Sequence, residues 1–519
     1  MKISVLIGIG ILLSILVLPA LVSSESSNLG GDGPQRLSLP ANYSPHSSII
    51  IQSDEDFAAQ GWAGSGTVED PYRLSGFEFT TDATAIEISG TLAHFVISDC
   101  YFSAISDPFA GQGIKFSRLQ NGIVNNCIFT YINGGIMLEY ADVCVVNNCT
   151  VNESNIPLTV YESDRCLISD NSIAGMVMVY DSDDCFLIGN EQTQYGISED
   201  SVGFELMWSD RCTLANNSFS RNTYGLWMSC CLDLQVENNT FVENGLVLNG
   251  PEVAHYVIEE SDNMVNGLPL GYFSFETERS IDASEFGQLI LVECSDVLVE
   301  NGHIQNATTG VLIAFCGRCN ISSMTLEDNN FGISFEHTVD SQVRASWMIN
   351  NRYGVFLSEL SQEISIINNT ICDNDQGISF ASASACTVLD NVLVDNEQLG
   401  LGVGGSGSTI CYNTFGRNGQ NAVDQGYGNL WDNEVDCGNF WDDAVLGAVY
   451  VIPGEAGSVD RYPNGTAGTY TPAITTNPVW IGNNTLFTIP LELLVVAGAS
   501  VGTVIIVAVI VHTRQGKIG

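Results

Sequence analysis

The sequence repeats itself with a period of about 22 residues over most of its length. Each clear copy has an aliphatic residue, a variable residue, an Asn or Asp, an anchor residue and then a short strand-forming run. We take as anchors Cys127, Cys149, Asn171, Asn217, Asn239, Asn369 and Asn391, with weaker copies at Cys100, Asn190, Gly302, Met324, Ser346, Asn413 and Asn433. The one long step, from Asn239 to Gly302, is close to three periods. Such a repeat predicts one structural unit per period, stacked on its neighbours.

A second marker, a glycine followed by an aliphatic or aromatic residue, recurs in phase with the first. It stands at Gly113, Gly135, Gly203, Gly225, Gly310, Gly332, Gly354, Gly377 and Gly400. Each glycine opens a short run of alternating apolar and polar residues, which is typical of a strand. No long helical period interrupts residues 80–440. We therefore predict an all-β fold, a right-handed parallel β-helix with coils of about 22 residues.

The cysteines follow the same period. Six of them, Cys144, Cys166, Cys185, Cys212, Cys319 and Cys386, lie five residues before an anchor, and Cys100, Cys127 and Cys149 are anchors themselves. A free cysteine packs as a small apolar residue, so we expect inward columns of reduced thiols, although neighbouring coils lie close enough for some disulfides. The Cys316–Cys319 pair forms a CxxC motif, for which a structural role is favoured over a metal or redox site.

Charge excludes several classes of partner. The chain carries 60 acidic and 16 basic residues, for a net charge of −44. Nucleic acid and anionic lipid surfaces are excluded, because both require clustered Lys and Arg. A hydrophobic content of 45% argues against disorder. An acidic surface of this kind attracts cations such as Ca²⁺.

Both ends have the composition of membrane signals. Residues 1–24 read as a secretory signal peptide, with an uncleaved anchor as the alternative. Residues 491–512 contain the uncharged run Leu493–Val511, which predicts a C-terminal transmembrane helix followed by a cytoplasmic tail at 513–519. Between them we expect an entry segment at 25–80, the β-helix at 81–463 and a Thr/Asn-rich stalk at 464–490. This organisation predicts a single-pass membrane protein with its ectodomain outside the cell.

Several segments resemble the NosD-like family of right-handed parallel β-helices, which belongs to a wider pectin-lyase-like group of carbohydrate-binding proteins and sugar hydrolases. The resemblance rests on the Asn-Asn-Thr/Ser coils, on an entry segment from Ile49 to Tyr72, on the segment Asp262–Tyr272, and on the closing segments Gly438–Asp442 and Asp460–Pro463. It covers about residues 45–463 and implies the fold. The family's namesake helps to assemble a copper site. Here six scattered histidines, and methionines at strand positions, do not favour copper delivery.

Four aspartates, Asp142, Asp164, Asp183 and Asp210, lie seven residues before their anchors and should stack in one outward column. Stacked carboxylates repel each other unless a cation or a basic side chain lies between them. Arg165 and Arg211 are one such source of charge, and a bound Ca²⁺ is the other. Solvated or arginine-paired corners and a calcium site both remain open from sequence.

Beside this column lie Tyr140, Tyr161, Tyr180, Trp208 and Trp227, interleaved with Glu139, Glu162, Asp181 and Glu205. Rings next to carboxylates suit a sugar-binding face, whereas aromatic cross-strand packing is the structural alternative. The loops 103–112 and 192–202 of the two longest coils could wall a groove.

A polysaccharide lyase or glycoside hydrolase using the same carboxylates is the catalytic alternative, although no catalytic motif singles out a pair. The sequence thus predicts a non-catalytic, membrane-anchored protein that binds an extracellular polysaccharide or another cell-envelope glycan.

Overall fold

The fold was obtained as a computed structural model, which describes residues 43–106, 110–194, 200–358, 360–445, 447–464, 479–481 and 485–487. Apart from Tyr43, these residues belong to one compact unit, Ser44–Gly519. The predicted signal peptide (1–24), the transmembrane segment (491–512) and the tail (513–519) lie outside the described residues. Within the described part of the chain, no helix is long and apolar enough to cross a membrane.

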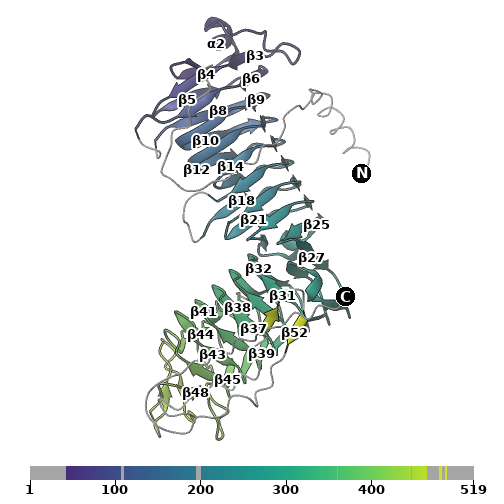
Figure 1. Ribbon diagram of the computed structural model, residues 1–519, viewed down its shortest axis with the longest axis vertical. Coiled ribbons are helices and arrows are strands. Elements are labelled where there is room, and N and C mark those ends of the chain that lie inside the picture. The colour runs from purple at the N-terminus through teal and green to yellow at the C-terminus, as the bar shows by residue number, and fades with distance from the viewer. Residues whose placement is uncertain are drawn as a thin grey trace, which may run out of the picture. The chain divides into compact units, whose positions relative to one another are not determined.

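The chain winds into a right-handed parallel β-solenoid of about 16 turns, which confirms the predicted fold (Figure 1). Short strands stack in register because the repeat places the same residue types at the same point of each coil. Neighbouring coils pair over the period expected from sequence, as in Val145↔Leu167 and Thr150↔Ser172. Rows of equivalent residues therefore run along the stack at a spacing of ~4.8 Å.

The N-terminal stack begins under a short helix, α2 (Asp54–Ala59), whose Phe57 is buried and stacks on Tyr72 with ring centroids 4.6 Å apart. One side of the stack is a nine-stranded parallel sheet. Its strands are β3 (Tyr72–Ser75), β6 (Phe95–Ser98), β9 (Gly122–Asn125), β11 (Val145–Asn147), β13 (Leu167–Ser169), β16 (Phe186–Ile188), β19 (Thr213–Ala215), β22 (Leu234–Glu237) and β25 (Ile258–Ser261).

Two further rows of strands complete these coils. The first comprises β1 (Ser44–Pro45), β4 (Phe77–Thr80), β7 (Tyr101–Ser103), the starts of β10 (Ile128–Asp142) and β12 (Thr150–Tyr161), β14 (Ser172–Ala174), β17 (Glu191–Thr193), β20 (Ser218–Ser220), β23 (Thr240–Val242) and β26 (Met264–Val265). The second comprises β2 (Ile49–Ile51), β5 (Thr84–Ser89), β8 (Gln112–Gln120), the ends of β10 and β12, β15 (Val177–Tyr180), β18 (Val202–Met207), β21 (Tyr224–Ser229) and β24 (Leu246–Asn249).

The 63-residue step is a junction and does not contain three regular coils. After one more coil the chain reverses, because β26 pairs antiparallel with β27 (Leu268–Ser274). Strand β27 then pairs in parallel with β29 (Gln288–Val292) and starts the second stack. The 3₁₀ helices η2 (Val253–Tyr256) and η3 (Ala283–Glu285) lie in this segment.

The C-terminal stack again has three rows of strands. The first row comprises β27, β29, β32 (Thr309–Ala314), β35 (Phe331–Glu336), β38 (Tyr353–Leu357), β41 (Gln376–Phe380), β44 (Leu399–Val403) and β47 (Ala422–Asp424). The second comprises β28 (Ser280–Asp282), β30 (Leu298–Glu300), β33 (Asn320–Ser322), β36 (Gln342–Arg344), β39 (Ser365–Ile367), β42 (Thr387–Leu389) and β45 (Thr409–Cys411). The third comprises β31 (His303–Gln305), β34 (Thr325–Glu327), β37 (Trp347–Ile349), β40 (Thr370–Cys372), β43 (Val392–Val394), β46 (Thr414–Gly416) and β48 (Phe440–Trp441). Two short antiparallel pairs follow. The first joins β49 (Tyr450–Val451) to β50 (Val459–Asp460), and the second joins β51 (Val479–Ile481) to β52 (Thr485–Phe487).

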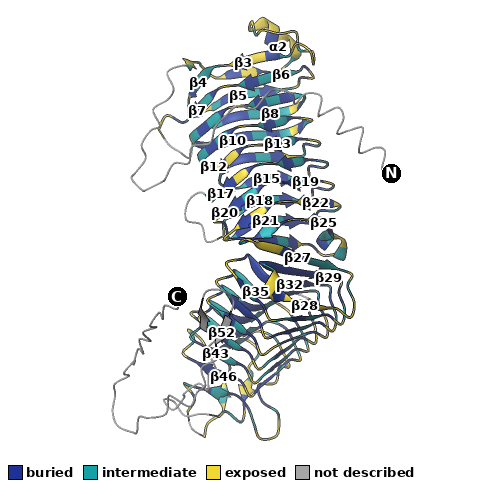
Figure 2. Cartoon of the chain, turned by 45° about the vertical axis from the view of Figure 1, so that its right-hand side comes forward, coloured by how far each residue is buried: buried dark blue, intermediate teal, exposed yellow. Residues whose placement is uncertain are grey.

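The core fills the inside of the coils, where buried aliphatic and aromatic side chains alternate with outward residues (Figure 2). The phased glycines stand where backbones approach most closely. A Cβ on Gly354 would lie 2.5 Å from the carbonyl oxygen of Gly377 in the next coil. All sixteen cysteines are free, and the nine cysteines assigned to columns are buried, as predicted.

Buried asparagines form ladders along the stack. In the first, each side chain from Asn171 to Asn239 donates to the amide oxygen of the next, at 2.9–3.0 Å, and the ladder ends at Asn263. The second runs through Asn369, Asn391, Asn413 and Asn439. Asn439, and not Asn433, is therefore the last anchor, because the final coil has 26 residues. Asn433 instead holds a turn by accepting the backbone N–H groups of residues 435–437.

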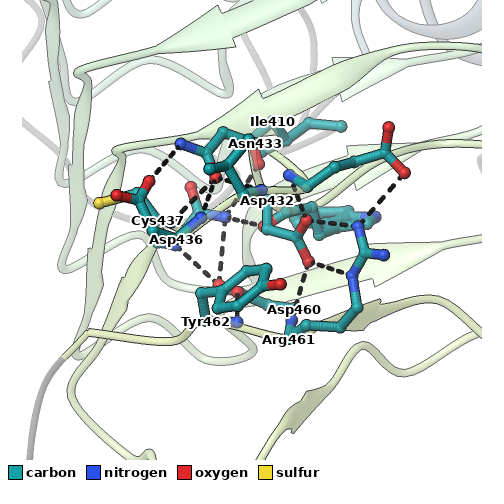
Figure 3. Close-up of polar contacts among 12 residues, drawn as sticks. Ile410, Asp432, Asn433, Asp436, Cys437, Asp460, Arg461 and Tyr462 are labelled. Atoms are coloured by element: carbon teal, nitrogen blue, oxygen red, sulfur yellow. Dashed lines mark hydrogen bonds and ion pairs between the residues drawn. The ribbon is translucent and has the colours of Figure 1, made fainter.

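Each of these two ladders ends on a carboxylate. Asn263 donates to Glu260, with its side-chain nitrogen 2.9 Å from Oε1. The backbone N–H of Asn439 donates to Asp460 at 2.7 Å. Asp460 is fully buried and also accepts the indole N–H of Trp441. Next to it Arg461 forms a two-pronged ion pair with the buried Asp432, so that polar side chains close the end of the solenoid (Figure 3).

Candidate functional site

The predicted sugar-binding residues lie on the outer surface of the N-terminal stack, where β10, β12, β15, β18 and β21 run side by side. Strand register separates them into rows. Glu139 pairs with Tyr161 and Tyr161 with Tyr180, so these three share one row. Glu205 pairs with Trp227 in the neighbouring row. Tyr140, Glu162 and Trp208 stand at the adjoining corner, where each has a left-handed backbone with φ near 50°.

The rings and carboxylates at this corner interlock. Tyr140 and Tyr161 meet edge to face with centroids 6.0 Å apart, and the Tyr140 hydroxyl donates to Glu162 at 3.1 Å. This hydrogen bond to a carboxylate raises the pKa of Tyr140, and Glu162 likewise raises that of Tyr161. Both rings remain about two-fifths exposed. The sequence prediction that these residues form one cluster is consistent with this geometry, whereas their binding of sugar remains a prediction.

A second pair of rings continues the surface toward the junction. Trp208 is 54% exposed and packs edge to face against Tyr180 at 6.0 Å. Trp227 is half-buried and leans on Tyr224, with ring centroids 4.8 Å apart. Trp227 therefore offers less of its face than Trp208. Burial raises the pKa of the neighbouring Glu205.

Two basic residues missing from the sequence prediction belong to this surface. Lys115 forms an ion pair with Glu139 at 3.0 Å, and the guanidinium of Arg118 lies 5.8 Å from the centre of the Tyr140 ring. Lys115 is the one lysine between the two ends of the sequence. Its isolation is visible in the sequence, but its place is not: the register of β8 on β10 pairs it with Met137, in the row that continues to Glu205 and Trp227, and its ion pair reaches Glu139 in the neighbouring row. The face thus carries both signs of charge around its rings.

The four predicted aspartates form the expected column, and each bonds the backbone of the next coil. The Oδ1 atoms of Asp142, Asp164 and Asp183 accept the N–H of the following column member at 2.9–3.1 Å, and Asp210 accepts from Leu232. Remaining charge is partly balanced by arginine. Arg211 contacts Asp183 at 2.7 Å and Asp184 at 2.9 Å, and Arg165 contacts Asp142 at 3.4 Å.

The described residues contain no group of three or more His, Cys, Asp or Glu side chains arranged to hold a metal ion. Each carboxylate of the column uses one oxygen for a backbone N–H, and its second oxygen takes no part in these bonds. Calcium binding by the column therefore remains a prediction. A lyase would need a base near the column, and the two arginines beside it, Arg165 and Arg211, are both occupied in ion pairs. Those of Arg211 raise the pKa of its guanidinium above the usual range.

A third amide ladder escaped the sequence prediction. It runs through Asn329, Asn351, Asn374, Asn396 and Asn418, with side-chain bonds of 2.8–3.1 Å. Its spacing of 22 or 23 residues is visible in the sequence, but its members lie five residues after the anchors, at another corner of the coil. It passes through Asn421 to Asp442 and Asp443, so this ladder also ends on carboxylates.

Comparison with known proteins gives a family and a set of remote structural likenesses. The family described as periplasmic copper-binding protein (NosD) matches residues 83–250 and 256–445. No curated protein matches the chain.

The solved structures that are similar include the A-module of the mannuronan C-5 epimerase AlgE6 from Azotobacter vinelandii, at 11% identity and a TM-score of 0.26, covering 73% of this chain and 98% of that one. An alginate lyase from a Paenibacillus species has 15% identity and a TM-score of 0.26, and the match covers 63% of this chain and 95% of that one. A tailspike protein of E. coli bacteriophage HK620, in complex with a pentasaccharide, has 13% identity and a TM-score of 0.27, and the match covers 68% of this chain and 69% of that one.

Proposed function

The chain belongs to the NosD family, and we propose that this member is a membrane-anchored cell-surface protein that binds a carbohydrate without turning it over. The observation that carries the proposal is the exposed set of rings on the N-terminal stack, of which Trp208 is more than half exposed. Exposed aromatic faces pack on the C–H faces of sugars, and neighbouring carboxylates accept hydroxyl hydrogens. The ligand is expected to be an extracellular polysaccharide or another cell-envelope glycan.

The spacing of the rings supports a chain-like ligand. Equivalent residues of neighbouring coils lie ~4.8 Å apart, so two coils span about the length of one to two sugar units. Rings from four consecutive coils, those of Tyr140, Tyr161, Tyr180 and Trp208, form the face. A polymer running along the solenoid would therefore meet a ring at regular intervals.

Copper handling, which the family description names, does not fit the residues described. Among the described residues, no histidine belongs to a group of three or more side chains that could hold a metal ion. His303 is occupied with Glu327 at 3.1 Å, and His337 stacks on Phe315 at 4.6 Å. Thirteen of the sixteen thiols are buried within coils.

A glycan array probed with the full-length chain tests the proposal. We expect binding to one class of polysaccharide, with at least a tenfold loss of affinity in Trp208→Ala and Tyr161→Ala. Leu360→Ala, an exposed apolar residue on the other stack, is the matched control and should bind as wild type.

The same glycans are then assayed for release of reducing ends or unsaturated products. Turnover that disappears in Asp164→Asn or Asp183→Asn would establish the polysaccharide lyase or hydrolase alternative instead. Absence of both binding and turnover across acidic and neutral polysaccharides would refute carbohydrate recognition by this face.

A further inference from the structure

Three cysteines meet at one corner of the C-terminal stack, where two thiol columns run side by side. Cys316 and Cys319 belong to the CxxC motif, and Cys294 lies in the preceding coil. The backbone N–H of Cys294 donates to Sγ of Cys316 at 3.2 Å, and the Cys319 thiol donates to the carbonyl oxygen of Cys294 at 3.7 Å. All three are at most 2% exposed.

The corner between Cys316 and Cys319 brings their side chains toward each other. Arg318 has a left-handed backbone with φ of 54°, which turns the chain sharply between the two cysteines. Both thiols face the inside of the coil, and each donates to a backbone carbonyl, Cys316 to Ala314 at 3.3 Å and Cys319 to Gly317 at 3.7 Å. Both sulfurs also bond the backbone of the same residue, Cys294, which brings them to one place, as a disulfide requires.

A small surface pocket lies over this corner. It measures about 280 Å³ and is lined by Arg318, Cys319, Asp340, Ser341, Gln342 and Ser365. Cys319 is thus the cysteine of the three that forms part of the wall. Arg318 brings a guanidinium to the same pocket, although it is paired with Asp296 at 2.7 Å. Interaction with the neighbouring Cys316 thiol lowers the pKa of Cys319, which favours its reactive thiolate, and it also lowers the pKa of Cys294, which does not line the pocket.

From this geometry we propose that Cys316 and Cys319 are a peroxide-reactive dithiol, with Cys319 as the attacking sulfur and Cys316 as the resolving one. Hydrogen peroxide is small enough to reach a sulfur that is only 1% exposed, whereas oxidised glutathione is too bulky to approach it, so we expect the dithiol to react with the peroxide and not with the disulfide. The site is independent of the glycan-binding face on the other stack.

The reaction balances as follows. The Cys319 thiolate attacks one oxygen of hydrogen peroxide, the O–O bond breaks, and the leaving hydroxide takes up a proton to become water. Cys319 is then a sulfenic acid. The Cys316 sulfur attacks the Cys319 sulfur, the S–O bond breaks, and the departing hydroxide takes the Cys316 proton. Two thiols and one peroxide thus give one disulfide and two waters.

Mass mapping of the reduced full-length chain tests the proposal. The chain is treated with hydrogen peroxide or with oxidised glutathione at equal oxidising equivalents, then denatured and alkylated. We expect a Cys316–Cys319 link with peroxide and at least tenfold less with oxidised glutathione. In Cys316→Ser, dimedone should instead trap a sulfenic acid on Cys319. This variant should fold, because Thr338 occupies the equivalent place in the next coil.

Cys386 is the matched control. It occupies the same register position as Cys319 three coils along, but Ala383 stands where the motif has its first cysteine. Burial raises the pKa of Cys386 to about 11. We expect Cys386 to stay reduced. The Cys316–Cys319 disulfide should still form in Cys294→Ser. The proposal is overturned if peroxide gives no link, if Cys386 reacts equally, if oxidised glutathione works as well as peroxide, or if a metal ion is found on the three thiols.

Discussion

The buried amides of the ladders hold neighbouring coils together one side chain at a time. Asn217 accepts both the backbone N–H and the side-chain N–H of Asn190, and its own nitrogen bonds the carbonyl of Leu187 and the side chain of Asn239. Every polar atom of the side chain is used. Removing it would leave several buried groups of neighbouring coils without a partner, which is costly.

We therefore predict that Asn217→Ala lowers the free energy of unfolding by about 2–4 kcal/mol. Asn216→Gly is the control, because Asn216 sits at the exposed left-handed corner where the preceding coil already has Gly189. Its effect should stay within about 0.5 kcal/mol. Guanidinium unfolding, together with amide hydrogen exchange of β16 and β19, measures the loss of stability in both variants. Equal effects in the two variants would contradict a special role for the buried amide.

The ion pair at the C-terminal end predicts a pH dependence. Arg461 lowers the pKa of Asp432 below its ordinary 3.8 by hydrogen bonding. Because the folded-state pKa is depressed, this carboxylate stabilises the fold fully above pH 3.8, and its contribution is lost as the pH falls through the lowered value.

In Arg461→Gln the buried Asp432 loses its charged partner, so its pKa should rise. The stability contribution of Asp432 should then decrease as the pH rises above 3.8, opposite in slope to wild type. Guanidinium unfolding between pH 3 and 7, followed by the fluorescence of the buried Trp431 and Trp441, measures this. Parallel profiles in the two proteins would show that Arg461 does not set this pKa.

Between the strands, the glycine columns determine how closely coils pack. The Cβ of an alanine at Gly354 would lie 2.5 Å from a backbone oxygen and 2.9 Å from Ile371. Gly317, in the same stack, has open surroundings, with no contact closer than 3.7 Å. We predict that Gly354→Ala costs about 1–3 kcal/mol or more, and that Gly317→Ala costs much less. Thermal melting compares them, and similar shifts would count against close packing as the reason for the marker.

The aspartate column makes a different prediction, because its carboxylates bond backbone N–H groups. Asp183→Asn keeps an oxygen for the N–H of Asp210 and loses only the exposed arginine pairs, for a cost of about 0–1 kcal/mol. Asp183→Ala also loses the backbone bond and should cost about 1–2 kcal/mol more. Thermal melting measures the loss of stability in both variants. A larger loss in Asp183→Asn than in Asp183→Ala would show that charge pairing dominates.

Melting with and without a chelator, in the same buffer, addresses the calcium prediction. A bound Ca²⁺ would stabilise the native state by mass action, so chelation would lower the melting temperature. The shift should vanish in Asp164→Asn. An unchanged melting temperature on chelation would reject calcium binding by the column.

The strands were predictable because each coil repeats one local pattern of apolar and polar residues. The phase of the anchors, the buried cysteines and the column Asp142–Asp210 all followed from spacing alone. The division of the aromatic residues into rows did not, because it depends on where each strand ends and the left-handed corner begins. Tyr140 and Tyr161 are neighbours in space for this reason, whereas Trp227 lies in another row.

Along the solenoid, the junction and the closing segment were the parts that sequence did not predict in detail. Both break the period. At the junction the reversal between β26 and β27 replaces regular coils, and at the end the last anchor shifts from Asn433 to Asn439. Periodicity carries no information where the period is interrupted, so these places depend on tertiary packing.

The closing segment covers the last coil and predicts a consequence for association. Trp441 is fully buried between Phe415, at 4.4 Å, and Tyr450, at 4.0 Å. We predict that Trp441→Ala costs about 3–5 kcal/mol and exposes unpaired strand edges, which promote edge-to-edge association. Light scattering measures the result, and Trp208→Ala serves as the exposed control. A monodisperse Trp441→Ala protein would show that the edge is protected otherwise.

The carboxylates at the ends of the amide ladders give the solenoid a direction of growth. Within each ladder the side-chain N–H groups all point the same way, so the aligned dipoles leave a donor end, and Glu260, Asp460 and the pair Asp442 and Asp443 each supply the anion that it needs. Repeats can be duplicated or deleted inside a ladder without altering its polarity. Extension beyond its end would place another amide against a carboxylate that is already occupied, so a ladder can be lengthened from within but not from its acidic end.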